Sequence, residues 1–377
     1  MPVRRHESVA FTVVVCVIAA LAAIPIAIVM ALSGEPQALV FGALFALVPV
    51  GPVLACYMWL DRYEPEPRAL LTAGLMWGAF VATLLALVVQ GLGGFVGGIT
   101  DSTMLAVVAP FSEEATKGLF LVLLLIWRRQ EFDGVLDGIV YAGVIGIGFA
   151  FTENILYLAA AYNGTDGSNP GGFSGLGVLF VLRCIASPFA HPLFTAFTGI
   201  GIGIAISQRS TLVRILAPIV GYLCAVALHA AWNGSTLLAD GAGFIIVYVI
   251  VMIPVFLMFV GVAIWVRTRE RRLLSVALRD AAQRGLIPAD DIEHIVDLRA
   301  RRQARQHARQ YGGRAGHHAM HEYQQAAVEL GYLHHRVLRG TAPSNFAERG
   351  QRFVETMHIN RPRIAFPQVA ASGGRHL

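Results

Sequence analysis

The 377-residue sequence has little charge: 14% of its residues are Asp, Glu, Lys or Arg, whereas 56% are hydrophobic. So few charges in a chain of this length argue against a soluble protein and are typical of membrane proteins. Lysine is almost absent, since Lys117 is the only one and the other 28 basic residues are arginines. The four cysteines all fall inside long apolar runs, which argues against the disulfide framework of a small secreted protein.

Long apolar runs recur along the first two thirds of the chain, and each is long enough to cross a hydrocarbon core of about 30 Å as a helix. We predict eight membrane-spanning helices, at residues 10–32, 38–60, 69–91, 104–127, 135–160, 176–207, 213–237 and 243–266. The first run follows Arg4 and Arg5, but it is about twice the usual length of a signal peptide and seven others follow it, so we expect no cleavage. The expected fold class is therefore an all-α, polytopic membrane protein.

Basic residues are missing from every second loop. No Lys or Arg occurs in the loops at 33–37, 92–103, 161–175 and 238–242. Arginines occur instead before the first span and in the intervening loops. Because cytoplasmic loops carry the excess of positive charge, both termini are predicted to be cytoplasmic. We expect the protein to reside in the cell membrane.

The segment 267–377 is a separate basic tail, with 19 arginines against 10 acidic residues. Its pattern predicts helices at 275–310 and 318–339 and partial disorder after about 340. A basic segment next to the last span is expected to bind anionic lipids of the inner leaflet. No nucleic acid is expected as a partner, because the sequence contains no recognisable nucleic-acid-binding motif. The expected parts are thus a cytoplasmic N-terminus (1–9), a transmembrane domain (10–266) and this helical cytoplasmic tail.

Several ionisable and polar side chains lie deep inside the predicted spans. They are Glu113, Glu114, Lys117, Glu153, His191, His229 and Asn233. A charged side chain at mid-membrane costs roughly 2.5 to 3.5 kcal/mol, so the three glutamates and the lysine together would cost on the order of 10 kcal/mol if left unpaired. Whole proteins are stable by only about 5 to 15 kcal/mol. These groups must therefore compensate one another or serve a chemical purpose.

Four of these groups lie at nearly the same depth. Counted from the cytoplasmic end of its span, Glu113 lies about 14 residues in, Glu153 about 18, and His191 and His229 about 16 each. At about 1.5 Å per residue, these depths correspond to roughly 21 to 27 Å above the inner surface. We therefore expect side chains from four helices to meet in one layer of the outer leaflet.

Within the fourth predicted span, Glu113 and Lys117 are four residues apart with the glutamate first, so a simple ion pair is one interpretation. That pair would leave Glu114 without a partner nearby in the sequence, which favours a catalytic role for at least one glutamate. In the seventh span, His229 and Asn233 share a face one turn apart and can address the same reacting centre.

Small residues recur at intervals of four in the fifth and sixth spans. They are Ala142, Gly146 and Ala150 in the fifth span and Gly199 and Gly203 in the sixth. This spacing permits close approach of membrane helices. The glycines are therefore assigned to packing and not to catalysis.

Three kinds of chemistry can use the intramembrane set. A glutamate base can activate water for amide hydrolysis, with His and Asn stabilising the oxyanion. A zinc ion held by His191, His229 and a glutamate can support the same reaction, although the sequence contains no HExxH motif. A proton or ion relay can use the same groups for transport. A fourth option, a serine protease built on the tetrad 172–175 (Gly-Phe-Ser-Gly), is disfavoured because the tetrad lies in a Gly- and Asn-rich outer loop.

These motifs resemble those of the PrsW-type intramembrane proteases, a family within the wider group of CAAX-processing and bacteriocin-processing membrane proteases. The segment 113–117 resembles the family's paired-glutamate motif, Phe149 to Asn154 its second motif, His191 its third, and His229 to Asn233 its HxxxN motif. The acidic, proline-rich loop 61–67 also resembles the segment after the family's second helix. The resemblance covers about residues 61–233 and leaves out the tail.

The resemblance implies a protease that cuts a single-pass membrane protein, typically an anti-sigma factor, on its extracytoplasmic side. It also implies roles for the site residues. Glu113 and Glu114 would supply the base and a partner that activates water or binds metal, and Asn233 would donate to the oxyanion. Glu153, His191 and His229 would bind water or a metal, with Zn²⁺ the expected ion. The wider group often has His at Glu153 and Arg at Lys117, so a metal-dependent and a glutamate-dependent peptidase both remain open.

Two other functions stay open at this stage. A proton- or ion-coupled transporter would use the same buried acids and imidazoles as a relay. A membrane scaffold descended from such enzymes would keep the residues without the chemistry. The first would show transport without cleavage, and the second would tolerate substitution of the glutamates.

Overall fold

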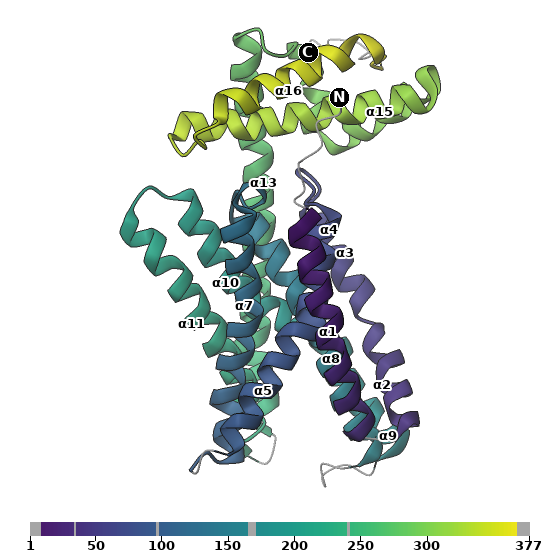
Figure 1. Cartoon of the computed structure of the whole chain (residues 1–377), viewed down its shortest axis with the longest axis vertical. Coiled ribbons are helices and arrows are strands. Elements are labelled where there is room, and N and C mark those ends of the chain that lie inside the picture. Colours follow the sequence, from purple (N-terminus) through teal and green to yellow (C-terminus); the bar gives the residue numbers. More distant parts are fainter. Residues whose placement is uncertain (1–8, 34, 96–97, 165–170, 240–241, 368–377) are drawn as a thin grey trace, which may run out of the picture. The chain divides into compact units, whose positions relative to one another are not determined.

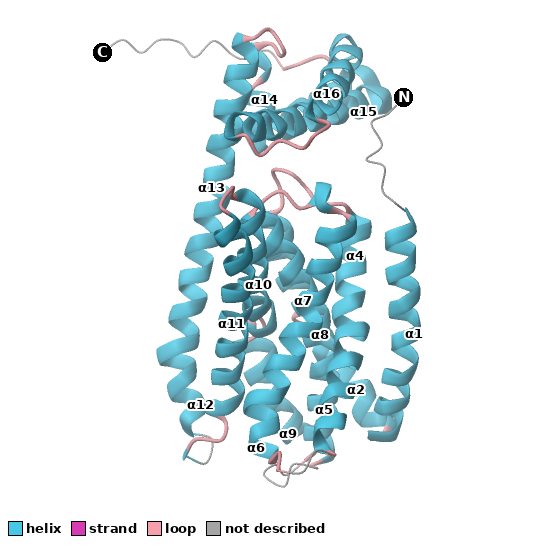
Figure 2. Cartoon of the chain, turned by 60° about the vertical axis from the view of Figure 1, so that its left-hand side comes forward, coloured by secondary structure: helices cyan, strands magenta, loops and turns pink. Residues whose placement is uncertain are grey.

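The computed structural model describes residues 9–33, 35–95, 98–164, 171–239 and 242–367. Every regular element in these ranges is a helix, as Figure 2 shows. The predicted fold class, an all-α polytopic membrane protein, is confirmed. The described residues form two compact units: a membrane unit (9–61 and 65–266) and a C-terminal unit (62–64 and 267–367).

The membrane unit is a set of long helices that run side by side (Figure 1). Their bounds are α1 Val9–Ser33, α2 Pro36–Leu47, α3 Val50–Leu60, α4 Arg68–Met76, α5 Thr83–Gly94, α6 Asp101–Thr103, α7 Ala109–Trp127, α8 Val135–Asn163, α9 Gly172–Phe180, α10 Ala190–Ser207, α11 Thr211–Ser235, α12 Ala242–Val247 and the first part of α13 Ile253–Gln283. Four π-helical turns extend or join these helices, at Trp77–Ala82, Met104–Val108, Val181–Ala186 and Tyr248–Met252. Such turns are frequent at functional sites.

Seven helical segments of the described chain are long and apolar enough to cross a membrane, and they correspond to seven of the eight predicted spans. The remaining prediction, 104–127, is continuous helix from Asp101 to Trp127 and packs against α5 and α11. This helix carries three charged residues near its centre, Glu113, Glu114 and Lys117. These charges explain why its composition alone does not identify it as a membrane span. Large apolar side chains such as Leu21 and Ile250 are exposed on the surface of the unit, as contact with lipid requires.

Helix α8 lies at the centre of the membrane unit and packs against α2, α4 and α10. Glycines set its distance from α10, as the small-residue spacing predicts. A Cβ atom on Gly146 would lie 2.7 Å from the Cα atom of Pro192, and one on Gly138 would lie 2.1 Å from the carbonyl oxygen of Gly199. Side chains at these positions would force the helices apart, so the glycines allow His191, next to Pro192, to reach α8.

The sixth predicted span, 176–207, is two helices and not one. The chain leaves helical geometry at Ser187 (φ −128°, ψ 40°), directly before Pro188, and α10 begins at Ala190. Proline disfavours helical geometry in the residue that precedes it, and it has no N–H to continue the helix. Non-helical backbone at membrane depth is tolerated where protein buries it or where it lines a cavity. This break lies immediately before His191.

The C-terminal unit has its own apolar core. Its further helices are α14 Glu293–Val296, α15 Leu298–Arg339 and α16 Phe346–Asn360, which pack with the last part of α13. Leu278 of α13, Met320 and Val328 of α15 and Met357 of α16 are all almost fully buried in this core. The unit therefore contains a packed helical cluster, although its sequence is rich in arginine.

Two predictions for the tail need correction or restriction. A single helix over 275–310 is wrong, because α13 ends at Gln283, Gly285 adopts φ 74°, and α15 begins only after Asp297, whose carboxylate accepts the backbone N–H of residues 299 and 300. The predicted helix at 318–339 is the second part of α15, after a kink at Gly313. The region after 340, where the sequence predicts partial disorder, contains α16, and residues 368–377 lie outside the described residues.

Candidate active site

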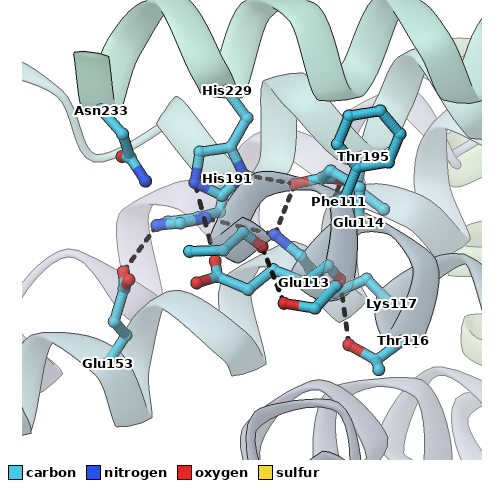
Figure 3. Close-up of polar contacts among 12 residues, drawn as sticks. Phe111, Glu113, Glu114, Thr116, Lys117, Glu153, His191, Thr195, His229 and Asn233 are labelled. Carbon is cyan, nitrogen blue, oxygen red and sulfur yellow. Dashed lines mark hydrogen bonds and ion pairs between the residues drawn. The ribbon is translucent and has the colours of Figure 1, made fainter. Parts of the chain in front are cut away.

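Side chains from α7, α8, α10 and α11 point toward one another inside the membrane unit, as Figure 3 shows. Glu113 is 6% exposed, and Glu114, Lys117 and His229 are fully buried. Aromatic side chains contact two of these groups. Lys117 Nζ lies 4.2 Å from the centre of the Phe149 ring, and the His229 ring stacks on the ring of Phe194. The acids and imidazoles expected to meet at one depth therefore do lie together.

Glu114 is held on both carboxylate oxygens. Its Oε1 accepts from Lys117 Nζ at 2.6 Å and from His229 Nδ1 at 3.0 Å, and its Oε2 accepts from Thr195 Oγ1 at 3.0 Å. The interpretation that Lys117 pairs with Glu113 is thus corrected, because the lysine pairs with Glu114 at the i,i+3 spacing. A carboxylate on Nδ1 fixes the tautomer of His229 and leaves its Nε2 lone pair available.

Glu113 is held on one side only. Gln90 Nε2 of α5 donates to its Oε1 at 3.1 Å. Its Oε2 has no hydrogen-bond partner among the described residues, and the same is true of His229 Nε2. These two buried atoms face each other at 3.6 Å, beyond hydrogen-bond distance. Two acceptors in this position call for a proton donor or a cation between them.

His191 connects the two halves of the cluster. Its Nε2 contacts Glu153 Oε2 at 2.7 Å, and its Nδ1 lies 3.3 Å from Lys117 Nζ. Its ring centre lies 5.0 Å from that of His229 and 5.3 Å from that of Phe149. Both nitrogens of His191 therefore have partners, whereas only Nδ1 of His229 has one among the described residues.

The charges of the cluster do not balance. Three carboxylates, Glu113, Glu114 and Glu153, face two cations, Lys117 and Arg183. Lys117 pairs with Glu114, and Arg183 pairs with Glu153. Because a buried carboxylate is costly without compensation, Glu113 is the position that needs a bound cation or a proton.

A cavity of about 300 Å³ leads to Glu113 and Glu153. Residues from α5 to α8 line most of it, and Asn233 of α11 lies in its wall. The amide of Asn233 donates to the backbone carbonyl of Leu105 at 3.1 Å, so this residue borders the cavity while its amide is bonded to backbone. The cavity is large enough to admit water and part of a substrate.

One group of three possible metal ligands occurs in the described part of the chain, and it consists of Glu113, His191 and His229. One potential ligand atom from each lies within 4.8 Å of the others. The group differs from the expected ligand set in having Glu113 where the resemblance implies Glu153. The unpartnered atoms of Glu113 and His229 fit a metal ion, since carboxylate oxygen and imidazole nitrogen are both zinc ligands.

The serine alternative receives no geometric support. Ser174 is exposed at the start of α9, and its Oγ donates to the carbonyl oxygen of Gly171 at 3.0 Å. A serine nucleophile needs a base within hydrogen-bond reach of its hydroxyl. The hydroxyl here is bonded to backbone instead.

Sequence reasoning missed three residues that contact the cluster: Gln90, Arg183 and Thr195. Gln90 lies near the end of its span, where a polar residue is ordinary, and Thr195 is a small residue in an apolar run. Arg183 did carry a signal, because it is a charged residue well inside the predicted span 176–207. An intramembrane charge of this kind is a functional candidate by itself.

Comparison with known proteins identifies the family to which the chain belongs. Residues 66–259 match the family model described as PrsW family intramembrane metalloprotease. A Protease PrsW from Geobacillus kaustophilus (strain HTA426) is 30% identical over 166 residues, which cover 43% of this chain and 66% of that protein. A Protease PrsW from Clostridioides difficile (strain 630) is 33% identical over 118 residues, 30% of this chain and 49% of that protein.

A third relative, Protease PrsW from Bacillus subtilis (strain 168), is 30% identical over 126 residues, 31% of this chain and 54% of that protein. The chain therefore spans about half to two thirds of the length of these curated relatives. No solved structure matches the chain.

Proposed function

Because the chain belongs to the PrsW family of intramembrane metalloproteases, we propose that it hydrolyses a peptide bond of a single-pass membrane protein. The observation that carries this proposal is the pair of buried atoms Glu113 Oε2 and His229 Nε2, which have no hydrogen-bond partner among the described residues, together with the cavity that Glu113 lines. Purely structural ion pairs satisfy their buried atoms, whereas a hydrolytic site must keep a place for the attacking water.

The chain's own residues account for activation of water. A water molecule between Glu113 Oε2 and His229 Nε2 can donate one hydrogen to each, which satisfies both acceptors. Glu113 then removes a proton as the water oxygen attacks the substrate carbonyl, and it returns this proton to the amide nitrogen as the C–N bond breaks. Glu114 acts through His229, because it fixes the ring and the tautomer, and Lys117 holds Glu114 in turn.

A metal ion fits at the same atoms. Glu113, His191 and His229 would hold it, with His191 exchanging one of its present hydrogen bonds. A bound zinc ion would supply Lewis-acid stabilisation of the negative charge that develops on the substrate carbonyl. Asn233 would provide a further oxyanion donor if it exchanges its hydrogen bond with Leu105, as the family resemblance implies.

The substrate and the cellular setting are part of the proposal. The resemblance to the family favours an anti-sigma factor, cut on its extracytoplasmic side, and cytoplasmic termini follow from the arginine distribution. Exposed arginines of α15, among them Arg302, Arg309 and Arg314, support binding of the C-terminal unit to anionic lipid. The protein would then reside in the cell membrane.

The test is co-expression with a library of single-pass reporter proteins that carry a tag on each side of the membrane and varied sequence at its outer boundary. We expect the parent chain to cleave a subset of reporters. Glu113→Gln should lower the cleavage rate by about 10²- to 10⁴-fold, because the base is lost. Glu35→Gln is the matched control, since it removes an exposed carboxylate at the start of α2 and should leave cleavage intact.

A cleavage rate equal in the parent and in Glu113→Gln would contradict the proposal, as would a library with no cleaved member. Proton-driven uptake into liposomes without cleavage would favour the transporter instead. Treatment of the purified protein with a chelator separates the two hydrolytic chemistries. Loss of cleavage that zinc restores supports the metal site, and persistence of cleavage supports the glutamate mechanism.

A further inference from the structure

Arg183 is a charged residue within the membrane unit that sequence reasoning did not assign. It belongs to the π-helical turn Val181–Ala186, between α9 and the break before α10, and its side chain is 16% exposed. An arginine inside a membrane span is costly unless partners compensate its charge. The turn is continuous with α9, so a regular helix in its place would direct side chain 183 differently.

The guanidinium group of Arg183 is held by one face of α8. Its Nη2 donates to Glu153 Oε2, and its Nε donates to Asn154 Oδ1 at 2.8 Å. Its plane also lies over the ring of Tyr157, with 4.1 Å from Cζ to the ring centre. These contacts use the fork geometry and the flat face that distinguish arginine from lysine.

Glu153 transmits this contact to the cluster. The oxygen that accepts from Arg183 Nη2 is the same Oε2 that lies 2.7 Å from His191 Nε2. Arg183 thus neutralises Glu153 and fixes the direction of its carboxylate. The carboxylate in turn assigns the N–H of His191 to Nε2, and His191 Nδ1 faces Lys117. The chain of contacts runs Arg183, Glu153, His191.

We propose that Arg183 is a positioning residue of the peptidase site, acting on His191 through Glu153. Its second role is electrostatic: by compensating Glu153, it leaves Glu113 as the one carboxylate of the three that is available to water or a cation. Arg183 does not itself line the cavity that leads to Glu113, so it acts on the site through Glu153 and not by direct contact with a substrate in that cavity. This inference rests on the proposed peptidase function.

The experiment compares Arg183→Gln, Arg183→Lys, Glu153→Gln and the double variant Arg183→Gln/Glu153→Gln in the purified full-length protein, with a reporter that the parent cleaves. We expect Arg183→Gln to lower kcat by at least about tenfold while KM stays within about twofold, because the positioning of His191 is lost whereas the Arg183 side chain itself forms no part of the cavity wall. Arg183→Lys should recover part of kcat, since it keeps the charge but not the fork. Arg214→Gln, an exposed arginine of α11, is the matched control and should match the parent.

A separate readout does not require cleavage. Arg183→Gln should lower the melting temperature more than the double variant does, because the single change strands a buried carboxylate and the double change removes it. An unchanged kcat in Arg183→Gln, a raised KM with kcat unchanged, or additive melting shifts would each overturn the inference. If the parent cleaves no reporter, the proposed function fails. The melting temperatures of the single and double variants still decide whether Arg183 and Glu153 are energetically coupled.

Discussion

Buried carboxylates occur in both units, and their surroundings differ. In the C-terminal unit, Asp291 accepts from Tyr323 Oη at 2.5 Å and from Arg361 Nε and Nη2 at 2.6 and 3.0 Å, so both of its oxygens have partners. Burial and the hydrogen bond to Asp291 raise the pKa of Tyr323 above its usual value, so the phenol remains a donor. In the membrane unit, Glu113 has one oxygen on Gln90 and one with no partner in the described chain.

The difference separates structural from chemical use of a buried acid. A carboxylate with all of its oxygens bonded stabilises the elements that supply its donors. A buried carboxylate oxygen that has no partner in the described chain and faces an imidazole nitrogen in the same situation is retained at a cost to stability, and function is the reason to retain it. Glu114 and Asp291 belong to the first class and Glu113 to the second, although Glu113 and Glu114 are neighbours in the sequence.

The largest effect on stability is expected for Lys117→Met. This change strands Glu114 in a fully buried place where only His229 and Thr195 still donate to it. Breaking a buried ion pair in this way typically costs about 3 to 5 kcal/mol. Thermal unfolding of the purified protein in detergent measures the loss. The double variant Glu114→Gln/Lys117→Met is the control, and it should recover much of the loss because neither charge of that pair remains. A loss below about 1 kcal/mol in the single variant would place Glu114 outside the structural class.

A smaller effect is expected for Asp291→Asn. An amide cannot accept hydrogen bonds from Tyr323 and from both donors of Arg361. At least one hydrogen bond between the helical segments that carry these residues is therefore lost. We expect a loss of about 1 to 3 kcal/mol, less than for Lys117→Met because the Arg361 side chain is 39% exposed and can turn to water. Hydrogen exchange of α16 in the full-length protein measures it. Asp290→Asn, the exposed neighbour, is the control. Faster exchange in both variants alike would remove the distinction.

The sequence was sufficient to predict the gathering of the site, because depth depends only on where each span begins and on the rise per residue. Glu153, His191 and His229 meet as that calculation implies. It could not decide which glutamate Lys117 contacts, since spacings of three and four share one helix face. Lys117 contacts Glu114 because two further donors also hold the Glu114 carboxylate. These donors are His229 and Thr195, which come from other helices.

The remaining differences have the same origin. Hydropathy is averaged over a window, so one arginine does not interrupt the apolar span 176–207. For the same reason, the average does not reveal the helix break next to Pro188. The partner of Arg183, on α8, lies about 30 residues earlier in the chain and becomes visible only when the helices are packed. Arg183 is recognisable in the sequence as a single charge inside an apolar span, whereas only the contact with Glu113 identifies Gln90.

The smallest effect is expected for the exposed pair Glu348 and Arg352 of α16, which has the favourable i,i+4 order but side chains 67% and 52% exposed. Water solvates both charges whether or not they touch, so Arg352→Gln should change the unfolding free energy by no more than about 0.5 kcal/mol. The same unfolding measurement as for Lys117→Met, repeated at about 1 M salt, provides the control, because salt should erase even this difference. If Arg352→Gln costs as much as Asp291→Asn, burial is not what separates these carboxylates, and the argument that sets Glu113 apart loses its premise.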